Sequence, residues 1–250
     1  MKNIILLTGI FILACQDQPK KKITEENSTK TEFNESTEAN WINLFDGKTF
    51  NGWHQYNKTE MSPAWSVEDG AMVFTPNGKK YGGGHNIVTD DDYTNFELSL
   101  EWKISEGGNS GIFWGVKEDP KYFEAYQTGP EVQVLDNDRH PDAKANPKYH
   151  QAGALYDLVQ PSKDVCNPAG SWNKVILMVN HISNKGSIKL NNTEIATFPV
   201  NGEPWKELVS GSKFDNETFS DFGRFKSGKI GLQDHGDVVS YRNIKIREID

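Results

Sequence analysis

The sequence predicts an all-β domain in which two antiparallel sheets pack as a sandwich. Residues 95–104 alternate between apolar and polar side chains, the period of two expected for a strand with one buried face. Residues 172–181 carry an apolar run on both faces, so we expect a central strand between two layers. Roughly ten to twelve such short segments, separated by turn residues, are typical of a sandwich.

Two turns predict hairpins. Gly107-Gly108 follows the strand at 95–104, and residues 109–116 are expected to be its hairpin partner. Asn191-Asn192 predicts a second tight turn between two short strands. The remaining predicted strands are 65–68, 71–75, 131–136, 172–181, 187–190, 194–198, 229–233 and 238–249. The expected core contains Leu100, Trp102, Val132, Val134 and Leu177.

One short helix is expected near 203–209. Pro204 suits its first turn, and Gly211 lies just past its end. Two long irregular stretches, 76–94 and 137–171, separate predicted strands. Loops of that length in a compact domain usually serve function.

Composition and charge exclude several classes of protein. The chain has 250 residues, of which 36% are hydrophobic and 11% aromatic, too many for a disordered protein. Its net charge is −8, which argues against a nucleic-acid partner because phosphate binding needs a basic surface. Only one apolar run exceeds about ten residues, so a multi-span membrane protein is excluded.

The N-terminus has the pattern of an export signal. Lys2 precedes an apolar stretch that ends in Ala14-Cys15, and this junction resembles the lipobox of bacterial lipoproteins. We expect a signal peptide at 1–14, a lipidated Cys15 with a polar tether to residue 40, and one domain at 41–250. The protein would then be a periplasmic or outer-membrane lipoprotein whose only membrane contact is the lipid anchor. A plain secretory signal is the alternative, and Cys166 is expected to be a loop thiol.

The strand EVQVLD holds the first candidate site residues. Val132 and Val134 should face the core, which places Glu131 and Gln133 on the other face, with Asp136 at the strand end. A Glu and a Gln in register beside a long polar loop suit a ligand surface. The alternative is an ordinary face exposed to water.

Further candidates lie where strands meet loops. His150 has the side chain suited to proton transfer near neutral pH, although a lone His is more often a packing residue. The segment NSGIFWG offers Asn109, Ser110 and Trp114, and GLQDHG offers Gln233 and His235. A Trp beside polar groups suits sugar stacking, and Trp is also a common core residue. We expect one concave pocket in which Glu131 and Gln133 share a face with Ser110 and Trp114, with His150 and His235 at the rim.

Standard catalytic motifs are absent from the sequence. It contains no Gly-x-Ser-x-Gly elbow, HExxH helix, Gly-x-Gly-x-x-Gly fingerprint or P-loop. The spacing of His140 and His150 from nearby aspartates fits no standard metal pattern.

Several ordered motifs resemble one family. The stretch 43–53, NLFDGKTFNGW, looks like the opening of the 3-keto-disaccharide hydrolase domain family, and the likeness covers about residues 41–250. Phe50 stands where Leu is common, and His85-Asn86 where an acidic residue is frequent. The further motifs are NFELSLEWKI, GNSGIFWG, GPEVQVLD, HQAGALYDL, SGSKF, GLQDHG and YRNIKIREI.

The resemblance implies a concanavalin A-like or laminin G-like jelly roll that cleaves 3-keto-glycosides or 3-keto-disaccharides. A separate sugar C3 oxidoreductase would supply this substrate, and some relatives look like lyases and others like hydrolases. The C3 ketone acidifies the C2 proton, so one base can start an elimination at C1. His150 or Glu131 is the candidate base, and Asn109, Gln233 and His235 could hold the ketone or hydroxyls.

Two points stay open at this stage. A divalent cation could stabilise the enolate, with Glu131 and a His as its candidate ligands, and the sequence does not assign it. The alternative function is a non-catalytic carbohydrate-binding module on the same jelly roll, which would need aromatic and polar side chains but no base.

Overall fold

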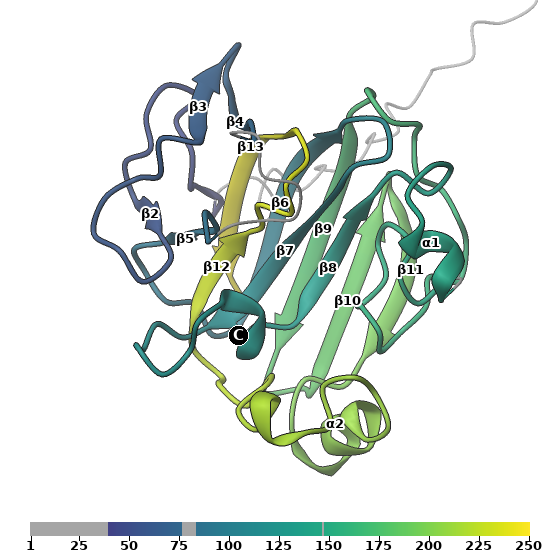
Figure 1. Ribbon diagram of the computed structural model, residues 1–250. Coiled ribbons are helices and arrows are strands. Elements are labelled where there is room, and N and C mark those ends of the chain that lie inside the picture. Colours follow the sequence, from purple (N-terminus) through teal and green to yellow (C-terminus); the bar gives the residue numbers. More distant parts are fainter. Residues whose placement is uncertain (1–39, 77–83, 147) are drawn as a thin grey trace, which may run out of the picture. The chain divides into compact units, whose positions relative to one another are not determined.

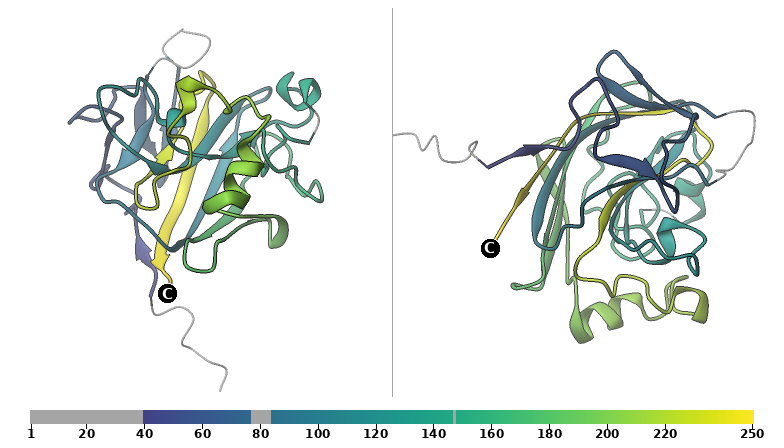
Figure 2. Two further views of the ribbon diagram at one scale, coloured as in Figure 1. Left: turned by 90° about the horizontal axis from the view of Figure 1, so that it is seen from below. Right: turned by 90° about the vertical axis from the view of Figure 1, so that its left-hand side faces the viewer.

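The computed structural model describes residues 40–76, 84–146 and 148–250. The predicted signal peptide, Cys15 and the tether up to residue 39 lie outside these residues. Within them, thirteen strands form two antiparallel sheets that face each other, with few short helices (Figures 1 and 2). The predicted all-β, two-sheet jelly-roll sandwich is confirmed.

The larger sheet has eight strands and lies behind the smaller one in the view of Figure 1. Strand β1 (Ile42–Asn43) joins this sheet by pairing with β13 (Val239–Glu248). The order of the other seven is β11 (Thr193–Phe198), β10 (Lys185–Leu190), β9 (Asn173–Asn180), β6 (Phe96–Ile104), β13, β4 (Ala71–Phe74) and β3 (Trp65–Glu68).

The smaller sheet has five strands and carries the candidate site. Their order is β2 (Trp53–Gln55), β5 (Ile87–Thr89), β12 (Lys229–Leu232), β7 (Asn109–Val116) and β8 (Glu131–Leu135). The helices are the 3₁₀ turns η2 (Ala125–Gln127) and η3 (Glu217–Phe219) and the α-helices α1 (Asp142–Ala145) and α2 (Gly202–Val209). In the described residues, no helix is both long and apolar enough to cross a membrane.

The core lies between the two sheets, and the alternation in β6 explains its larger half. Leu98, Leu100 and Trp102 point inward and are at most 1% exposed, while Glu101 on the outer face pairs with Arg242 at 2.8 Å. All five predicted core residues are buried. Substituting a buried aromatic such as Trp102 by Ala typically costs about 3–5 kcal/mol.

Strand β9 corrects one expectation. It is an interior strand between β10 and β6, as predicted, but only one of its faces is fully buried. Ile176 and Met178 are half-exposed on the outer face of the sheet, where none of the described residues forms a second layer over them. An apolar run can therefore mark a strand with one buried and one half-exposed face.

The predicted hairpin between residues 95–104 and 109–116 is wrong. Strand β6 pairs with β9 and β13, whereas β7 pairs with β12 and β8, so the chain passes from one sheet to the other at the Gly107-Gly108 turn. Asp136 holds this turn against the end of β8, because its carboxylate accepts from the Gly107 N–H at 2.7 Å and its N–H donates to the Gly108 carbonyl at 3.0 Å.

The second predicted hairpin is confirmed. Strands β10 and β11 pair directly, and Asn191 and Asn192 between them have φ values of 47° and 68°. Two successive left-handed residues match the right-handed twist of the flanking strands, and Asn tolerates that conformation. The predicted helix near 203–209 is also confirmed as α2, which buries Trp205.

Candidate active site

A cavity of about 400 Å³ opens on the outer face of the smaller sheet, where β7, β8 and β12 lie side by side. Its walls combine a polar half from these strands with an aromatic half from loops and short helices. Among the described residues, the lining consists of Asn109, Tyr126, Gly129, Glu131, Gln133, Tyr156, Lys213, Phe214, Phe219, Gln233 and His235.

The period of two in β8 places Glu131 and Gln133 in this cavity. Val132 and Val134 alternate with them and are buried in the core. Residues 153–156 run along the free edge of β8, where the Tyr156 N–H donates to the Glu131 carbonyl at 2.9 Å. The β8 edge is thus covered, and Tyr156 is brought beside Glu131.

Gly111 makes room for the carboxyl group of Glu131. Gly111 on β7 is paired with Gln133 of β8, so a side chain there would point to the cavity face. A Cβ atom added at Gly111 would overlap Oε1, Cδ and Cγ of Glu131. The side chain of Glu131 therefore lies across β7 in the space that the glycine leaves free.

Burial raises the pKa of Glu131 to about 8. The residue is 8% exposed, and the nearby carboxylate of Asp142 raises its pKa further while the positive charge of Lys213 opposes the shift. In the amide orientation that pairs donors with acceptors, the Gln133 nitrogen donates to Glu131 Oε1 at 3.2 Å and to Asn109 Oδ1 at 3.3 Å. Glu131 is therefore a buried carboxyl group that changes its protonation state near neutral pH.

Lys213 supplies the positive charge in the cavity. Its Nζ lies 4.0 Å from the ring centroid of Tyr156 and 5.1 Å from that of Phe214. Its backbone N–H donates to Asp157 Oδ2 at 2.9 Å, which fixes this segment beside the loop that carries Tyr156. Among the residues that the structure describes, the Lys213 ammonium has no hydrogen-bond or ion-pair partner.

The end of β12 adds two polar groups to the wall. The Gln233 N–H donates to the Gly111 carbonyl at 3.0 Å, while its buried Oε1 accepts no hydrogen bond from the described residues. Burial is the main cause that lowers the pKa of His235, so its imidazole is neutral near pH 7. A buried acceptor without a donor costs free energy unless a ligand or water satisfies it, which suits Gln233 to a sugar hydroxyl.

His150 does not line the cavity, contrary to expectation. Its Nδ1 lies 2.8 Å from Asp142 Oδ1 and its Nε2 lies 3.0 Å from Asp157 Oδ1, so both ring nitrogens are engaged by carboxylates. Its ring stacks on that of Tyr156 at 4.3 Å. His150 therefore lies behind Tyr156, where it orders the loop and has no free nitrogen to accept a substrate proton.

Ser110 and Trp114 face the core, so the expectation that they share a face with Glu131 and Gln133 is wrong. Ser110 is paired with Val134, and its Oγ donates to the Gln233 carbonyl at 2.7 Å. The ring of Trp114 stacks on Phe198 of the opposite sheet at 5.8 Å. Both side chains lie between the sheets and cannot reach a ligand in the cavity.

Asp136 is likewise not a ligand-binding residue at this cavity. Its carboxylate is only 2% exposed and accepts from the backbone N–H groups of Gly107 and Asp138. Burial alone would raise the pKa of Asp136, but these hydrogen bonds and the nearby Arg139 outweigh it and lower the pKa. Asp136 is a structural residue of the turn between the sheets.

Sequence reasoning missed much of the aromatic and cationic wall. Tyr156 lies within the motif HQAGALYDL, Lys213 and Phe214 lie within SGSKF, and Gly129 opens GPEVQVLD, so the motifs contained the signal although none of these residues stood out. Tyr126 and Phe219 lie outside the quoted motifs. The missed lining residues are Tyr126, Gly129, Tyr156, Lys213, Phe214 and Phe219.

The described residues do not form a divalent-cation site around Glu131. No group of three or more His, Cys, Asp or Glu side chains in this part of the chain is arranged to hold a common ion. The Glu131 carboxyl group lies beside the Gln133 amide and the positive charge of Lys213, and that charge opposes the binding of a cation at the same carboxyl group.

Comparison with known proteins assigns the family. The model of the 3-keto-alpha-glucoside-1,2-lyase-like domain matches residues 40–247. The chain belongs to this family. A relative of this chain from Bacteroides thetaiotaomicron, named 3-keto-disaccharide hydrolase, is 36% identical to it over 84% of this chain and 79% of its own length.

Solved structures of similar proteins share the fold of this domain. One from Parabacteroides distasonis has a TM-score of 0.76 at 33% identity and covers 84% of this chain and 94% of its own. A second from the same organism has a TM-score of 0.64 at 25% identity, covering 84% and 99%. Both are described by name as candidate glycosyl hydrolases.

Proposed function

We propose that this protein cleaves the glycosidic bond of 3-keto-glycosides, including 3-keto-disaccharides, by removing the C2 proton and eliminating the group bound at C1. The observation that carries the proposal is Glu131, a buried carboxyl group in the cavity with a pKa raised to about 8. A general base is most effective when its pKa lies near the working pH. The family membership supports the same substrate class.

In the first step, the Glu131 carboxylate takes the proton from C2. The electron pair of the C2–H bond forms a C2=C3 double bond, and the ketone oxygen becomes an enolate oxygen. Its negative charge needs a cation or donors in a site sheltered from water. Lys213 supplies the cation, while Asn109, Gln133 and the neutral His235 supply hydrogen-bonding groups in the same cavity.

In the second step, the enolate reforms the ketone and the bond between C1 and the glycosidic oxygen breaks. The electron pair moves into a C1=C2 double bond, and the leaving oxygen takes the proton that Glu131 removed from C2, which gives a free hydroxyl and restores the carboxylate. Adding water across C1=C2, with the hydroxyl at C1 and the proton at C2, converts this elimination into net hydrolysis. Neither step changes the number of electrons in the sugar, so no redox cofactor takes part.

The cavity lacks the arrangement of ordinary glycosidases. Those enzymes use two carboxyl groups about 5–9.5 Å apart on either side of the bond. Among the lining residues that the structure describes, Glu131 is the only carboxyl group. One base is sufficient when a C3 ketone has already acidified the C2 proton.

A non-catalytic carbohydrate-binding module is the competing function. Such a module would gain nothing from a carboxyl group whose ionisation is made costly by burial. The raised pKa of Glu131 therefore favours the enzyme.

The test is to incubate the full chain with a 3-keto-glucoside in D₂O. NMR follows the release of the alcohol and the loss of the proton signal at C2 of the sugar. We expect release from the 3-keto-glucoside and much slower reaction of the unoxidised glucoside, whose C2 proton is not acidic. Glu131→Gln keeps the size of the side chain, removes the base, and serves as the matched variant. Equal rates with the oxidised and unoxidised sugars would contradict the mechanism.

We also propose that the enzyme acts in the cell envelope downstream of a sugar C3 oxidoreductase. The N-terminal signal pattern supports the location, and the need for a preformed ketone supports the partner. Cys15→Ser should move the protein from the membrane fraction to the soluble fraction. Retention of that variant in the membrane would contradict lipid anchoring.

A further inference from the structure

A strip of aromatic rings leads from the surface of the protein into the cavity. Phe123 is 62% exposed, and its ring centroid lies 6.1 Å from that of Tyr126. Tyr126 lies 6.3 Å from Phe219, which lies 5.2 Å from Phe214. We call these four residues the aromatic strip. Its last three members line the same cavity as Glu131.

Hydrogen bonds tie together the two short turns, η2 and η3, that carry Tyr126 and Phe219 of the strip. The side chain of Gln127 in η2 accepts from the Phe123 N–H at 2.6 Å through Oε1 and donates to the Thr218 carbonyl of η3 at 3.4 Å through Nε2. The Gly223 N–H donates to the Thr128 carbonyl at 2.8 Å and adds a second link. Tyr126 and Phe219 are thus held at fixed positions by hydrogen bonds on either side of the strip.

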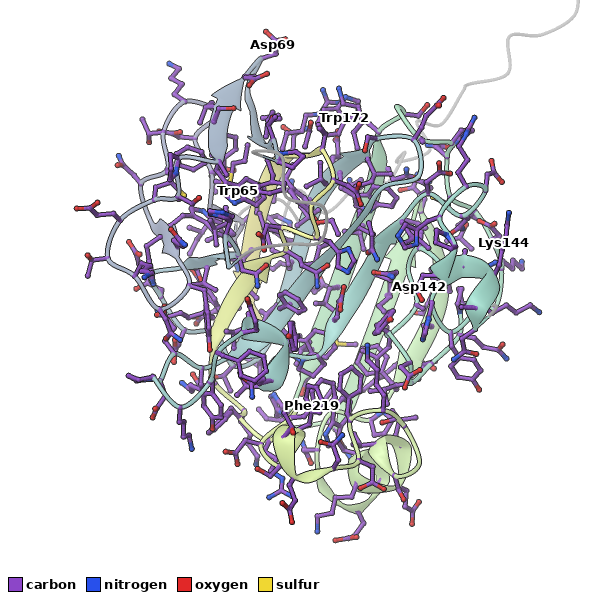
Figure 3. The ribbon with its side chains drawn as sticks, viewed as in Figure 1. Trp65, Asp69, Asp142, Lys144, Trp172 and Phe219 are labelled. Carbon is purple, nitrogen blue, oxygen red and sulfur yellow. The ribbon has the colours of Figure 1, made fainter. Side chains whose placement is uncertain are left out.

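Packing supports the inner end of the strip as well. Phe214 stacks on Phe222 with centroids 3.9 Å apart and an angle of 8° between the rings, and Phe222 stacks on Trp205 of α2 at 6.1 Å. Figure 3 labels Phe219 in the lower part of the view, the part in which Figure 1 labels α2. The helix and the segment that follows it therefore form a rigid backing for the aromatic wall.

The two halves of the cavity suit two parts of one substrate. The polar half contains the base, the ammonium and the amides, which match the ketone and hydroxyl groups of the oxidised sugar. The aromatic strip offers flat apolar faces, and Tyr126 is the only one of its four members with a hydroxyl group. Such faces bind rings by stacking, and an exposed Phe next to a binding cavity gains from being covered.

We propose that the aromatic strip is the leaving-group subsite, which stacks on a ring attached through the C1 oxygen of the 3-keto sugar. The enzyme then prefers leaving groups with a flat apolar face, whether an aromatic alcohol or a second sugar, over a small alkyl alcohol. This inference rests on the proposed function, because that function defines which group leaves.

Kinetics with three substrates test the subsite. The full chain is assayed with 3-keto-glucosides that carry phenol, glucose or methanol at C1. Phe123→Ala should lower kcat/KM for at least one ring-bearing substrate by about 2–10-fold, the value of one stacking contact, and leave the methyl substrate unchanged. The substrate that loses rate identifies the preferred ring. Phe219→Leu keeps the apolar volume, loses the flat ring, and should act in the same direction.

The matched control is Ile182→Ala. Ile182 is 77% exposed and lies outside the strip, so its loss removes a similar exposed apolar side chain without touching the cavity. It should leave all three rates unchanged. An equal loss for all three substrates in Phe123→Ala, or no loss for any, would overturn the subsite.

Binding without turnover separates this inference from the proposed function. Calorimetry with unoxidised phenyl glucoside should show weaker binding to Phe123→Ala than to the wild type, with no such difference for methyl glucoside. If no 3-keto-glucoside is cleaved but this difference appears, the proposed function fails and the ring-binding strip stands. If cleavage occurs but neither rates nor binding depend on Phe123, the strip is rejected and the function stands.

Discussion

The carboxyl group of Glu131 lies over Gly111, in the space that the Cβ atom of any other residue would occupy. The two residues are on neighbouring strands, and Gly111 is paired with Gln133. A glycine in β7 weakens the strand, because it has no side chain to pack. The loss of strand stability at Gly111 is offset by a gain in function, because the glycine lets the buried carboxyl group of Glu131 lie across the sheet and face the cavity.

Gly111→Ala should displace the Glu131 side chain. We expect kcat/KM for a 3-keto-glycoside to fall by about 10²-fold, because a base misplaced by roughly 1 Å loses its alignment with the substrate. Overpacking should also lower the free energy of unfolding by about 1–3 kcal/mol. Steady-state kinetics and denaturant titration measure both effects.

A double-mutant cycle identifies the cause of this loss. The same Gly111→Ala change should cost less stability in a Glu131→Ala background, where no carboxyl group competes for the space. Gly231→Ala on neighbouring β12 is the control, because its added Cβ would meet its nearest neighbours at 3.2 Å or more. Equal costs of Gly111→Ala in both backgrounds would show that the clash is not with Glu131.

The activity should depend on pH through Glu131. The base must be ionised, so kcat/KM should rise with pH and level off above about 8, the pKa to which burial raises this group. Lys213→Met removes the positive charge that opposes the shift, so the rising limb should move to higher pH and kcat should fall by about 10²-fold. Lys213→Arg keeps the positive charge, so the rising part of the pH–rate profile should stay near its original position. An unchanged profile in Lys213→Met would show that Lys213 does not affect the pKa of Glu131.

The stability of the protein should depend on pH in the opposite direction. The pKa of Glu131 is about 8 in the folded state and lies above the ordinary value of 4.5. Between these two pH values the folded protein keeps the proton on Glu131, whereas the unfolded protein has released it. The contribution of this group is fully present below pH 4.5 and is lost as the pH rises toward 8. Glu131→Gln removes that loss, and we expect it to be about 1–4 kcal/mol more stable than the wild type at pH 8 and much closer to it at pH 5. Thermal unfolding of both proteins at the two pH values measures the difference.

His150→Ala should behave as the loss of a positioning residue. Asp142 and Asp157 would each lose one hydrogen-bond partner, so we expect the free energy of unfolding to fall by about 1–3 kcal/mol. Turnover should fall far less than in Glu131→Gln, for which a lost general base costs about 10²–10⁴-fold. If His150→Ala instead lost that much activity with unchanged stability, His150 would be the base. Circular dichroism melts and kinetics on the same samples distinguish the two results.

The local periodicity of the sequence was sufficient to predict much of the fold. The alternation in 95–104 and in 131–134 identified which side chains enter the core, because successive residues of a strand must point to opposite faces. The pair Asn191-Asn192 identified a hairpin, because few residues accept two left-handed conformations in a row. The same alternation separated Glu131 and Gln133 from Val132 and Val134 and so indicated half of the candidate site.

The tertiary structure alone decided which strands are neighbours and which face of each strand meets the other sheet. Every residue of β7 is buried, so its sequence does not tell the core side of Ser110 and Trp114 from the cavity side of Asn109 and Gly111. Lys213 reaches Glu131 from a segment about eighty residues away along the chain, and His150 is turned away from the cavity by two carboxylates. Side-chain period is a property of one strand, whereas strand pairing and loop packing depend on contacts between distant segments, and no local pattern records them.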